Sequence, residues 1–208
     1  NIDYTIEDKC SSKSFNLSNY QRFIRIFMSP DTPYNGVLLF HGTGVGKTCS
    51  AVQIAEQFKD FYPHKISVIL SQSIEDGWKR TIFSPDKLNN QCLKNTYHQL
   101  LHRENKDSLI RKSQNRQVNK IIKNKYEFYG YQKFSNIINN IKKNYVKGEH
   151  GVKKRDLEIK AIRDNFSNSL LIIDEVHNIR LEDAGGNKEI RNIISNINDV
   201  ITHSHNLK

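Results

Sequence analysis

The stretch that decides the fold of this chain reads His41-Gly42-Thr43-Gly44-Val45-Gly46-Lys47-Thr48. It follows a short apolar run at 36–40 that is rich in strand-forming residues, and it precedes residues 49–61, whose apolar positions recur at helical spacing. A strand, a glycine-rich turn and a helix in this order are the context of a phosphate-binding loop. The glycines let the backbone turn tightly and aim its N–H groups inward, and the following helix presents the positive end of its dipole to the same point. The stretch therefore predicts a polyphosphate site.

Two side chains at the end of this loop have predicted roles. We expect Lys47 to reach the β- and γ-phosphates of a nucleotide and the Thr48 hydroxyl to ligate Mg²⁺. The strict pattern of such loops has a glycine where this chain has His41. The residues of this stretch that are predicted to bind the nucleotide are His41, Gly42, Thr43, Gly44, Val45, Gly46, Lys47, Thr48 and Cys49.

A second decisive run reads Ser169-Leu170-Leu171-Ile172-Ile173-Asp174-Glu175-Val176-His177. Four consecutive aliphatic residues followed by two acids predict a central parallel strand that is buried on both faces and ends in carboxylates. We expect Asp174 to hold Mg²⁺ through water opposite Thr48, and Glu175 to orient and deprotonate an attacking water. Because these acids follow a phosphate loop along the chain, we interpret Lys47, Asp174 and Glu175 as the catalytic residues.

Length and composition limit the classes of protein. A chain of 208 residues predicts one large α/β domain or one lobe of a larger assembly. Three cysteines, odd in number and far apart, predict neither a metal cluster nor a disulfide framework and favour a reducing, intracellular compartment. No apolar run approaches the ~18 residues of a membrane span, and no signal pattern opens the chain, so we expect no membrane partner. The chain begins without Met, which suggests an excised piece.

The positive charge is concentrated in the middle of the chain. Residues 85–160 contain 18 Lys and Arg against 7 Asp and Glu, whereas the rest of the chain contains 14 against 15. A basic block of this kind predicts a partner with a phosphate backbone, DNA or RNA. A solvated surface is the alternative. Within the block we predict a basic loop at 147–155, whose candidate nucleic-acid contacts are Lys153, Lys154 and Arg155.

The remaining segments alternate between helix and strand. Ser18 is a predicted N-cap for a helix over 19–28. We further predict a buried strand at 65–70, a helix from Asp107 to Ile122, a strand at 126–131 that ends in a turn, and an amphipathic helix around 134–141.

Further candidate site residues lie near these elements. The Gln21 amide offers a donor and an acceptor that match the adenine edge, with a surface amide as the alternative. Ser71 and Ser73 follow the strand at 65–70, where loops line the ligand crevice of a parallel sheet, so we expect them to contact a nucleic-acid phosphate. Trp78 belongs either to that contact or to the core, as an anchor for the next helix.

Together these residues resemble the superfamily-two helicases and translocases. Residues 42–48 look like their motif I, with a looser first position at His41 as in the helicase variant of the loop, and 174–177 look like the DExH form of motif II. Weaker likenesses link 17–21 to the glutamine motif, 71–73 with Trp78 to motif Ia, and 129–131 to the segment before motif II. The flanking segments look most like transcription helicases of large cytoplasmic DNA viruses, of the poxvirus early transcription factor and nucleoside triphosphatase I type.

The resemblance implies a fold, cofactors and partners. The implied fold is a RecA-like P-loop NTPase, an α/β three-layer sandwich whose mainly parallel sheet is flanked by helices. Residues 1–208 would form its first lobe, with a lead-in at 1–35 and a basic helical insertion at 85–160. The implied cofactors are ATP and Mg²⁺, and the implied partners are nucleic acid, a second RecA-like lobe with arginine fingers, and subunits of an RNA polymerase or transcription factor. Tyr131 would contact nucleic acid, His177 would couple the nucleotide site to strand sensing, and a viral protein would act in the virion and host cytoplasm.

The sequence therefore predicts the ATP-binding and ATP-hydrolysing lobe of a nucleic-acid-dependent ATPase in viral transcription, poorly active by itself. Two alternatives stay open: a regulatory or assembly module that binds ATP without moving along a strand, and a nucleic-acid-binding domain with a relic ATP site. The presence of Lys47, Thr48, Asp174 and Glu175 argues against a relic, because the loss of any one of them would disable hydrolysis.

Overall fold

Three short parallel strands form the centre of the computed structural model, which describes residues 15–40, 42, 44–84, 87, 91–94, 96–97, 108–179 and 187–208. The strands are β1 (Ile66–Ile69), β2 (Tyr126–Tyr129) and β3 (Leu171–Ile173), and they lie side by side in the order β2-β1-β3. Both pairings of β1 are parallel, so all three carboxyl ends meet at one edge of the sheet. The strands predicted at 65–70 and 126–131 are thus confirmed within a residue or two.

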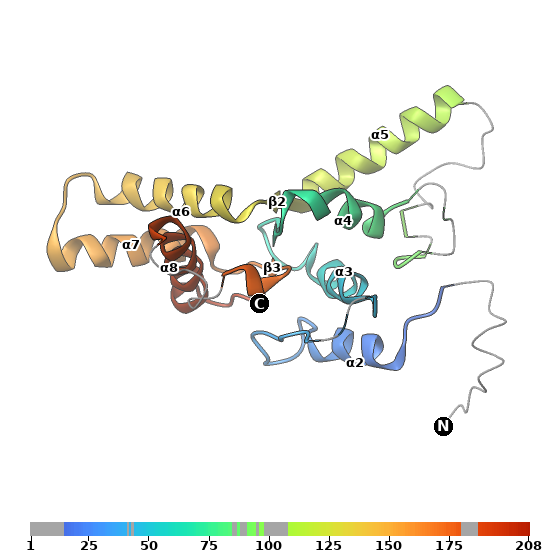
Figure 1. Ribbon diagram of the computed structural model, residues 1–208, viewed down its shortest axis with the longest axis horizontal. Coiled ribbons are helices and arrows are strands. Elements are labelled where there is room, and N and C mark those ends of the chain that lie inside the picture. The colour runs from blue at the N-terminus through green and yellow to red at the C-terminus, as the bar shows by residue number, and fades with distance from the viewer. Residues whose placement is uncertain are drawn as a thin grey trace.

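Helices cover both faces of this sheet (Figure 1). On one face lie α2 (Asn19–Phe27), α3 (Lys47–Phe58), α4 (Glu75–Ile82) and α5 (Ser108–Lys125). On the other lie α6 (Tyr131–Val146), α7 (Gly151–Phe166) and α8 (Lys188–His203). Two 3₁₀ turns, η1 (Gln72–Ile74) and η3 (Val176–Ile179), follow β1 and β3. Within the described ranges, no helix combines the length and the apolar character that crossing a membrane requires.

Strand β1 divides the core into two clusters. Successive side chains of a strand point to opposite faces, so Val68 and Leu70 pack with α2, α3, α4 and α5, whereas Ile69 packs with α6, α7 and α8. All three side chains are fully buried. The predicted three-layer α/β fold with a parallel sheet is therefore confirmed.

Helix α2 begins as its sequence predicts. The Ser18 hydroxyl accepts a hydrogen bond from the backbone N–H of Gln21, and the Gln21 side chain accepts one from the backbone N–H of Ser18, which is a complete capping box. This reciprocal pair satisfies two donors that a helix N-terminus otherwise leaves without partners.

The run at 36–40, predicted to be the strand before the phosphate loop, is not a strand. Leu38 and Phe40 in this run are 73% and 88% exposed. A strand needs a neighbour for its backbone groups, but this run lines a cavity that β3 also lines, and it pairs with none of the described strands. The position beside β3 is instead taken by Lys208, whose backbone N–H donates to the Ser169 carbonyl at 3.1 Å, and whose carbonyl accepts from the backbone N–H of Leu171 at 3.0 Å.

The prediction of a central strand buried on both faces before Asp174 is also wrong, because β3 stands at the end of the described order β2-β1-β3. Leu170 is 3% exposed, but each residue of β3 is only half-buried. The reason is the same cavity, which leaves part of this strand open.

The predicted basic loop at 147–155 is partly helical. The chain reverses at Lys147 and Gly148, both with positive φ, and α7 begins at Gly151. Helices α6 and α7 then form a long hairpin that projects to the left in Figure 1. We missed α7 because its buried positions, Ala161 and Ile162, give only a narrow apolar stripe on a charged helix.

Candidate nucleotide site

The phosphate loop leads directly into the first turn of α3. Gly44 and Gly46 have φ angles of 79° and 85°, which side chains with a Cβ rarely adopt. A Cβ built on Gly46 would also lie 2.7 Å from the Gln21 side-chain nitrogen, so this position excludes larger residues for two reasons. Lys47 is the first residue of α3, which places the positive end of the helix dipole at the loop. His41 and Thr43 lie outside the described residues.

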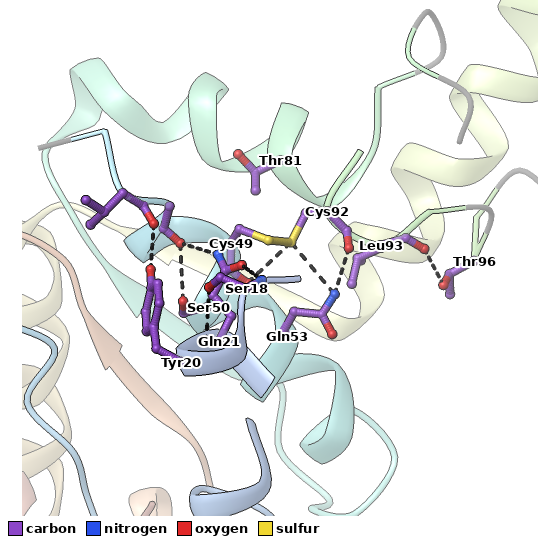
Figure 2. The surroundings of a disulfide bond; sticks show 12 residues. Ser18, Tyr20, Gln21, Cys49, Ser50, Gln53, Thr81, Cys92, Leu93 and Thr96 are labelled. Carbon is purple, nitrogen blue, oxygen red and sulfur yellow. Dashed lines mark hydrogen bonds between the residues drawn. A yellow bond between two sulfur atoms is a disulfide. The ribbon is translucent and has the colours of Figure 1, made fainter. Parts of the chain in front are cut away.

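Two side chains of helix α2 donate hydrogen bonds to backbone carbonyls of this loop (Figure 2). The Tyr20 hydroxyl donates to the Val45 carbonyl at 2.5 Å, and the Gln21 amide nitrogen donates to the Gly46 carbonyl at 3.3 Å. Gln21 is 6% exposed, and its amide oxygen already accepts from Ser18. The adenine contact predicted for Gln21 stays a prediction, whereas its contact with the phosphate loop has no local signal in the sequence.

A disulfide joins the first turn of α3 to a distant loop (Figure 2), so the prediction that the cysteines form no such bond is wrong. It links Cys49, next to Thr48, with Cys92. The Gln53 amide supports the same junction by donating to the Cys92 carbonyl at 2.7 Å. A separation of 43 residues gives no local signal, because only the folded chain brings the two sulfur atoms together. The nucleotide role predicted for Cys49 is not tested by this contact.

Removal of the disulfide is expected to destabilise the domain. A cross-link that closes 43 residues restricts the unfolded chain, and such links typically stabilise by about 2–4 kcal/mol. Cys92→Ser should therefore lower the urea midpoint and steepen the slope, because the unfolded chain without the cross-link exposes more surface. Dithiothreitol should lower the midpoint of the wild-type chain equally. Cys10→Ser, which leaves the Cys49–Cys92 pair intact, is the control. Equal midpoints with and without dithiothreitol would contradict the expectation.

The two predicted catalytic acids follow β3 in a tight turn. The backbone N–H of Asp174 donates to the Ile69 carbonyl at 2.9 Å, which continues the pairing of β3 with β1. Glu175 has a φ of 54°, and a non-glycine residue in this left-handed region carries strain of about 1–3 kcal/mol. The backbone N–H of Asn178 donates to the Glu175 carbonyl at 2.9 Å and leads into η3. Glu175 is thus held in a conformation that the turn around it imposes.

Two aromatic side chains contact these acids. The Trp78 indole nitrogen donates to the Asp174 carboxylate at 2.6 Å, and Trp78 is 2% exposed. The interpretation of Trp78 as a core anchor is therefore confirmed, and its buried ring offers no surface to a nucleic-acid base. The Tyr131 hydroxyl bonds the carbonyls of Asp174 and Glu175. Burial raises the pKa of Tyr131 to about 12, so this hydroxyl stays protonated at neutral pH and can donate.

His177 lies next to the predicted catalytic base. Its Nδ1 atom is 3.2 Å from the Glu175 carboxylate, and both side chains are exposed to solvent. A change in the position of His177 would therefore change the surroundings of the Glu175 carboxylate directly. This geometry is compatible with the coupling role that the resemblance implies, which stays a prediction.

One cavity of about 920 Å³ brings the two halves of the predicted site together. Lys47 and Thr48 line it from the start of α3, and Asp174, Glu175 and His177 line it from the end of β3. The run at 36–40 and the aliphatic residues of β3 form its apolar part. A smaller cavity of about 360 Å³, lined by Lys65, Glu127 and Tyr129 among others, contains none of the predicted site residues.

The other candidate nucleic-acid contacts lie apart from this cavity. The Ser71 and Ser73 hydroxyls are 2.8 Å from each other at η1. The three basic residues that were predicted to lie in a loop at 147–155 are on the first turns of α7. Each forms an ion pair with an acid: Lys153 with Glu149 at 2.6 Å, Lys154 with Glu158 at 3.9 Å, and Arg155 with Asp199 at 2.7 Å. Their contact with nucleic acid stays a prediction.

Known proteins resemble this chain over most of its length. The family described as Type III restriction enzyme, res subunit, matches residues 14–203. A candidate ATP-dependent RNA helicase of Acanthamoeba polyphaga mimivirus is 30% identical over 197 residues, which cover 83% of this chain and 16% of that protein. A candidate helicase of Invertebrate iridescent virus 3 is 30% identical over 202 residues, 93% of this chain and 18% of that protein.

A third relative links the chain to a transcription protein. It is the early transcription factor large subunit homolog of African swine fever virus, 30% identical over 150 residues, which cover 63% of this chain and 14% of that protein. The chain thus spans less than a fifth of the length of each of these three relatives. No solved structure matches it significantly. The family match, the parallel three-layer fold and the shared cavity lead to one conclusion: this chain belongs to the Type III restriction enzyme res subunit family and is a helicase-type P-loop NTPase domain.

Proposed function

We propose that this domain binds ATP with Mg²⁺ in the cavity between the phosphate loop and the end of β3, and that it hydrolyses ATP in response to nucleic acid during viral transcription. The observation that carries the proposal is the shared cavity, because Lys47 and Thr48 face the same space as Asp174 and Glu175. The names of the viral relatives support the helicase and transcription context.

The residues present fit Mg²⁺. Thr48 and Asp174 contribute oxygen atoms, which this hard cation prefers, and Mg²⁺ is usually held by one or two protein oxygens together with phosphates and water. Among the residues that the structure describes, no group of three His, Cys, Asp or Glu side chains gathers as a metal cage. When bound, the cation would neutralise the charge that develops on the phosphates.

The remaining chemistry is assigned to side chains of the domain. The loop N–H groups and Lys47 bind and orient the phosphates at the positive end of α3. Glu175 takes a proton from the attacking water. His177, whose Nδ1 atom lies 3.2 Å from the Glu175 carboxylate, couples this base to conformational changes elsewhere in the protein. An arginine finger from a second lobe would typically add ~10³-fold or more in rate, so we expect the domain alone to hydrolyse slowly.

The proposed function is tested by phosphate release with and without single-stranded DNA and RNA. The expected results are weak binding of Mg–ATP and slow hydrolysis by the 208-residue chain, and stimulation by nucleic acid in a protein that carries both lobes. Binding without any stimulation would favour the regulatory module instead. Full-rate, nucleic-acid-stimulated turnover by residues 1–208 alone would show that no second lobe is needed.

The predicted nucleic-acid face is tested by reversing charge on α7. Arg155 is left intact, because it binds Asp199 on α8. Burial alone would raise the pKa of Asp199, but hydrogen bonds from Arg155 and Lys142 lower this pKa to about 2. The double variant Lys153→Glu, Lys154→Glu should bind a labelled oligonucleotide more weakly. It should also show a flatter salt dependence between ~50 and 200 mM, because each neutralised phosphate releases counterions.

Two measurements complete this test. Nucleotide affinity should be unchanged in the double variant, and Lys188→Glu, a reversal outside the basic block, should leave oligonucleotide affinity nearly unchanged. Fluorescence anisotropy of the oligonucleotide reports both the affinity and the salt slope. An unchanged affinity and slope in the double variant would identify this part of α7 as a solvated surface or a protein-docking surface.

A further inference from the structure

Two aromatic residues contact the predicted catalytic acids from the helices that follow β1 and β2. Trp78 lies on α4, which follows β1, and Tyr131 is the first residue of α6, which follows β2. The strands are parallel and ordered β2-β1-β3, so the segments after β1 and β2 emerge at the same edge of the sheet as Asp174 and Glu175. The fold itself therefore brings these four residues together.

Trp78 fixes the orientation of the Asp174 carboxylate. The indole N–H donates to one carboxylate oxygen at 2.6 Å, and the backbone N–H of Glu175 donates to the other at 3.0 Å. With one donor on each oxygen, rotation of the carboxylate would break both hydrogen bonds. Each oxygen keeps a further lone pair with which it can accept a bond from a metal-bound water. Because Trp78 is 2% exposed, solvent does not compete for its N–H group.

Tyr131 holds the turn that carries the catalytic base. Its hydroxyl is hydrogen-bonded to the Asp174 carbonyl and lies 3.1 Å from the Glu175 carbonyl. Glu175 adopts a φ of 54°, so its backbone would relax toward a more common conformation without such contacts. The direction in which the Glu175 carboxylate points depends on this backbone conformation.

We propose that Trp78 and Tyr131 are positioning residues: Trp78 orients the Asp174 carboxylate, and Tyr131 holds the Asp174–Glu175 turn so that the base faces the cavity. The inference rests on the proposed function, because it concerns the two acids of that site. Both aromatics act through these acids, which differs from the nucleic-acid contacts predicted for them from the sequence. Residues that support metal ligands and catalytic groups in this way typically contribute about 10- to 100-fold in metal affinity or activity.

The contact between Trp78 and Asp174 has its own spectroscopic signal. The chain contains a single tryptophan, so a ¹⁵N-labelled sample gives one indole N–H resonance. Asp174→Ala should shift this resonance, because the indole loses a charged acceptor, whereas Asp156→Ala on the exposed side of α7 should not. In the wild-type chain, ADP with Mg²⁺ should shift it more than ADP in EDTA. An indole resonance that Asp174→Ala leaves in place would overturn the proposal for Trp78.

The functional consequence for Trp78 is measured by nucleotide binding. A fluorescent ADP analogue is titrated with Mg²⁺ and in EDTA, and Trp78→Phe should reduce the gain in affinity from Mg²⁺ about tenfold while leaving the affinity in EDTA unchanged. A purely structural role would alter both affinities. Retention of the full Mg²⁺ gain in Trp78→Phe would contradict the inference, and absence of any Mg²⁺ gain in the wild-type chain would contradict the proposed function instead.

Tyr131→Phe keeps the aromatic ring and removes only the hydroxyl. It therefore tests the positioning role of Tyr131 even if Trp78→Phe does not fold. We expect kcat for ATP hydrolysis to fall about tenfold with KM nearly unchanged. In a Glu175→Gln background the same substitution should cause no further loss, because Tyr131 acts through Glu175. A wild-type kcat in Tyr131→Phe, or an equal additional loss in the Glu175→Gln background, would show that Tyr131 does not position the base.

Discussion

Glu175→Gln is expected to bind ATP with nearly wild-type affinity and to hydrolyse it at least ~100-fold more slowly, since general base catalysis typically contributes 10²- to 10⁴-fold. The amide has almost the same shape as the carboxylate, but it cannot accept the proton of the attacking water. The substitution also keeps a side chain with a Cβ at a position with a φ of 54°, so the turn has no new reason to change.

The measurement is phosphate release at saturating nucleic acid, together with nucleotide affinity from a fluorescent analogue. Glu189→Gln, which removes an exposed carboxylate from the first turn of α8, is the matched control and should retain wild-type turnover. Near wild-type turnover in Glu175→Gln would assign the base to another group. A parallel loss of nucleotide affinity would point to a role of Glu175 in binding rather than in proton transfer.

Lys47→Ala is expected to abolish measurable nucleotide binding, with a loss of about 100-fold or more. Hydrogen bonds to charged groups contribute about 1.5–3 kcal/mol each, and the ammonium group of Lys47 would bond two phosphates at the positive end of α3. The cavity also excludes part of the bulk solvent, which strengthens the attraction between the ammonium group and the phosphates.

Thermal stability gives an independent readout of this loss. A ligand at 100 times its Kd stabilises the folded state by about 2.7 kcal/mol, so ADP with Mg²⁺ should raise the Tm of the wild-type chain and leave that of Lys47→Ala unchanged. Lys59→Ala is the control, because Lys59 caps the other end of the same helix and pairs with Glu56 at 2.7 Å. Wild-type affinity in Lys47→Ala would place the phosphates elsewhere in the cavity.

Features that depend on neighbouring residues were predicted well. The cap at Ser18 and the start of α3 after the glycine-rich loop follow from hydrogen bonds and dihedral preferences within a few residues. Strand β1 was recognised because a strand with both faces covered reads as a short, nearly continuous apolar run. The Asp174–Glu175 pair was recognised because an aliphatic run that ends in two acids has few purely structural explanations when a phosphate loop precedes it.

Features that depend on which segments meet were not predicted. The run at 36–40 has the composition of a strand, yet it lines a cavity together with β3 and pairs with no strand among the described residues. The basic residues from Lys153 to Arg155 read as a loop, yet they are helical and neutralised by Glu149, Glu158 and Asp199. In both cases the composition of the segment was identified correctly, but the residues that pack against the segment determined its secondary structure and its contacts.

By itself, the sequence determined that this protein has a phosphate loop before a helix and an acid pair after an aliphatic strand. These are local patterns, in which spacing and residue type alone constrain the backbone and the chemistry. Only the tertiary structure decided that Trp78 bonds Asp174, that Tyr131 holds the turn at Glu175, and that Cys49 pairs with Cys92. Those contacts follow from the strand order β2-β1-β3 and from the path of the chain across the sheet, which no local spacing encodes, because strand pairing is settled by competition among all the segments that can lie side by side.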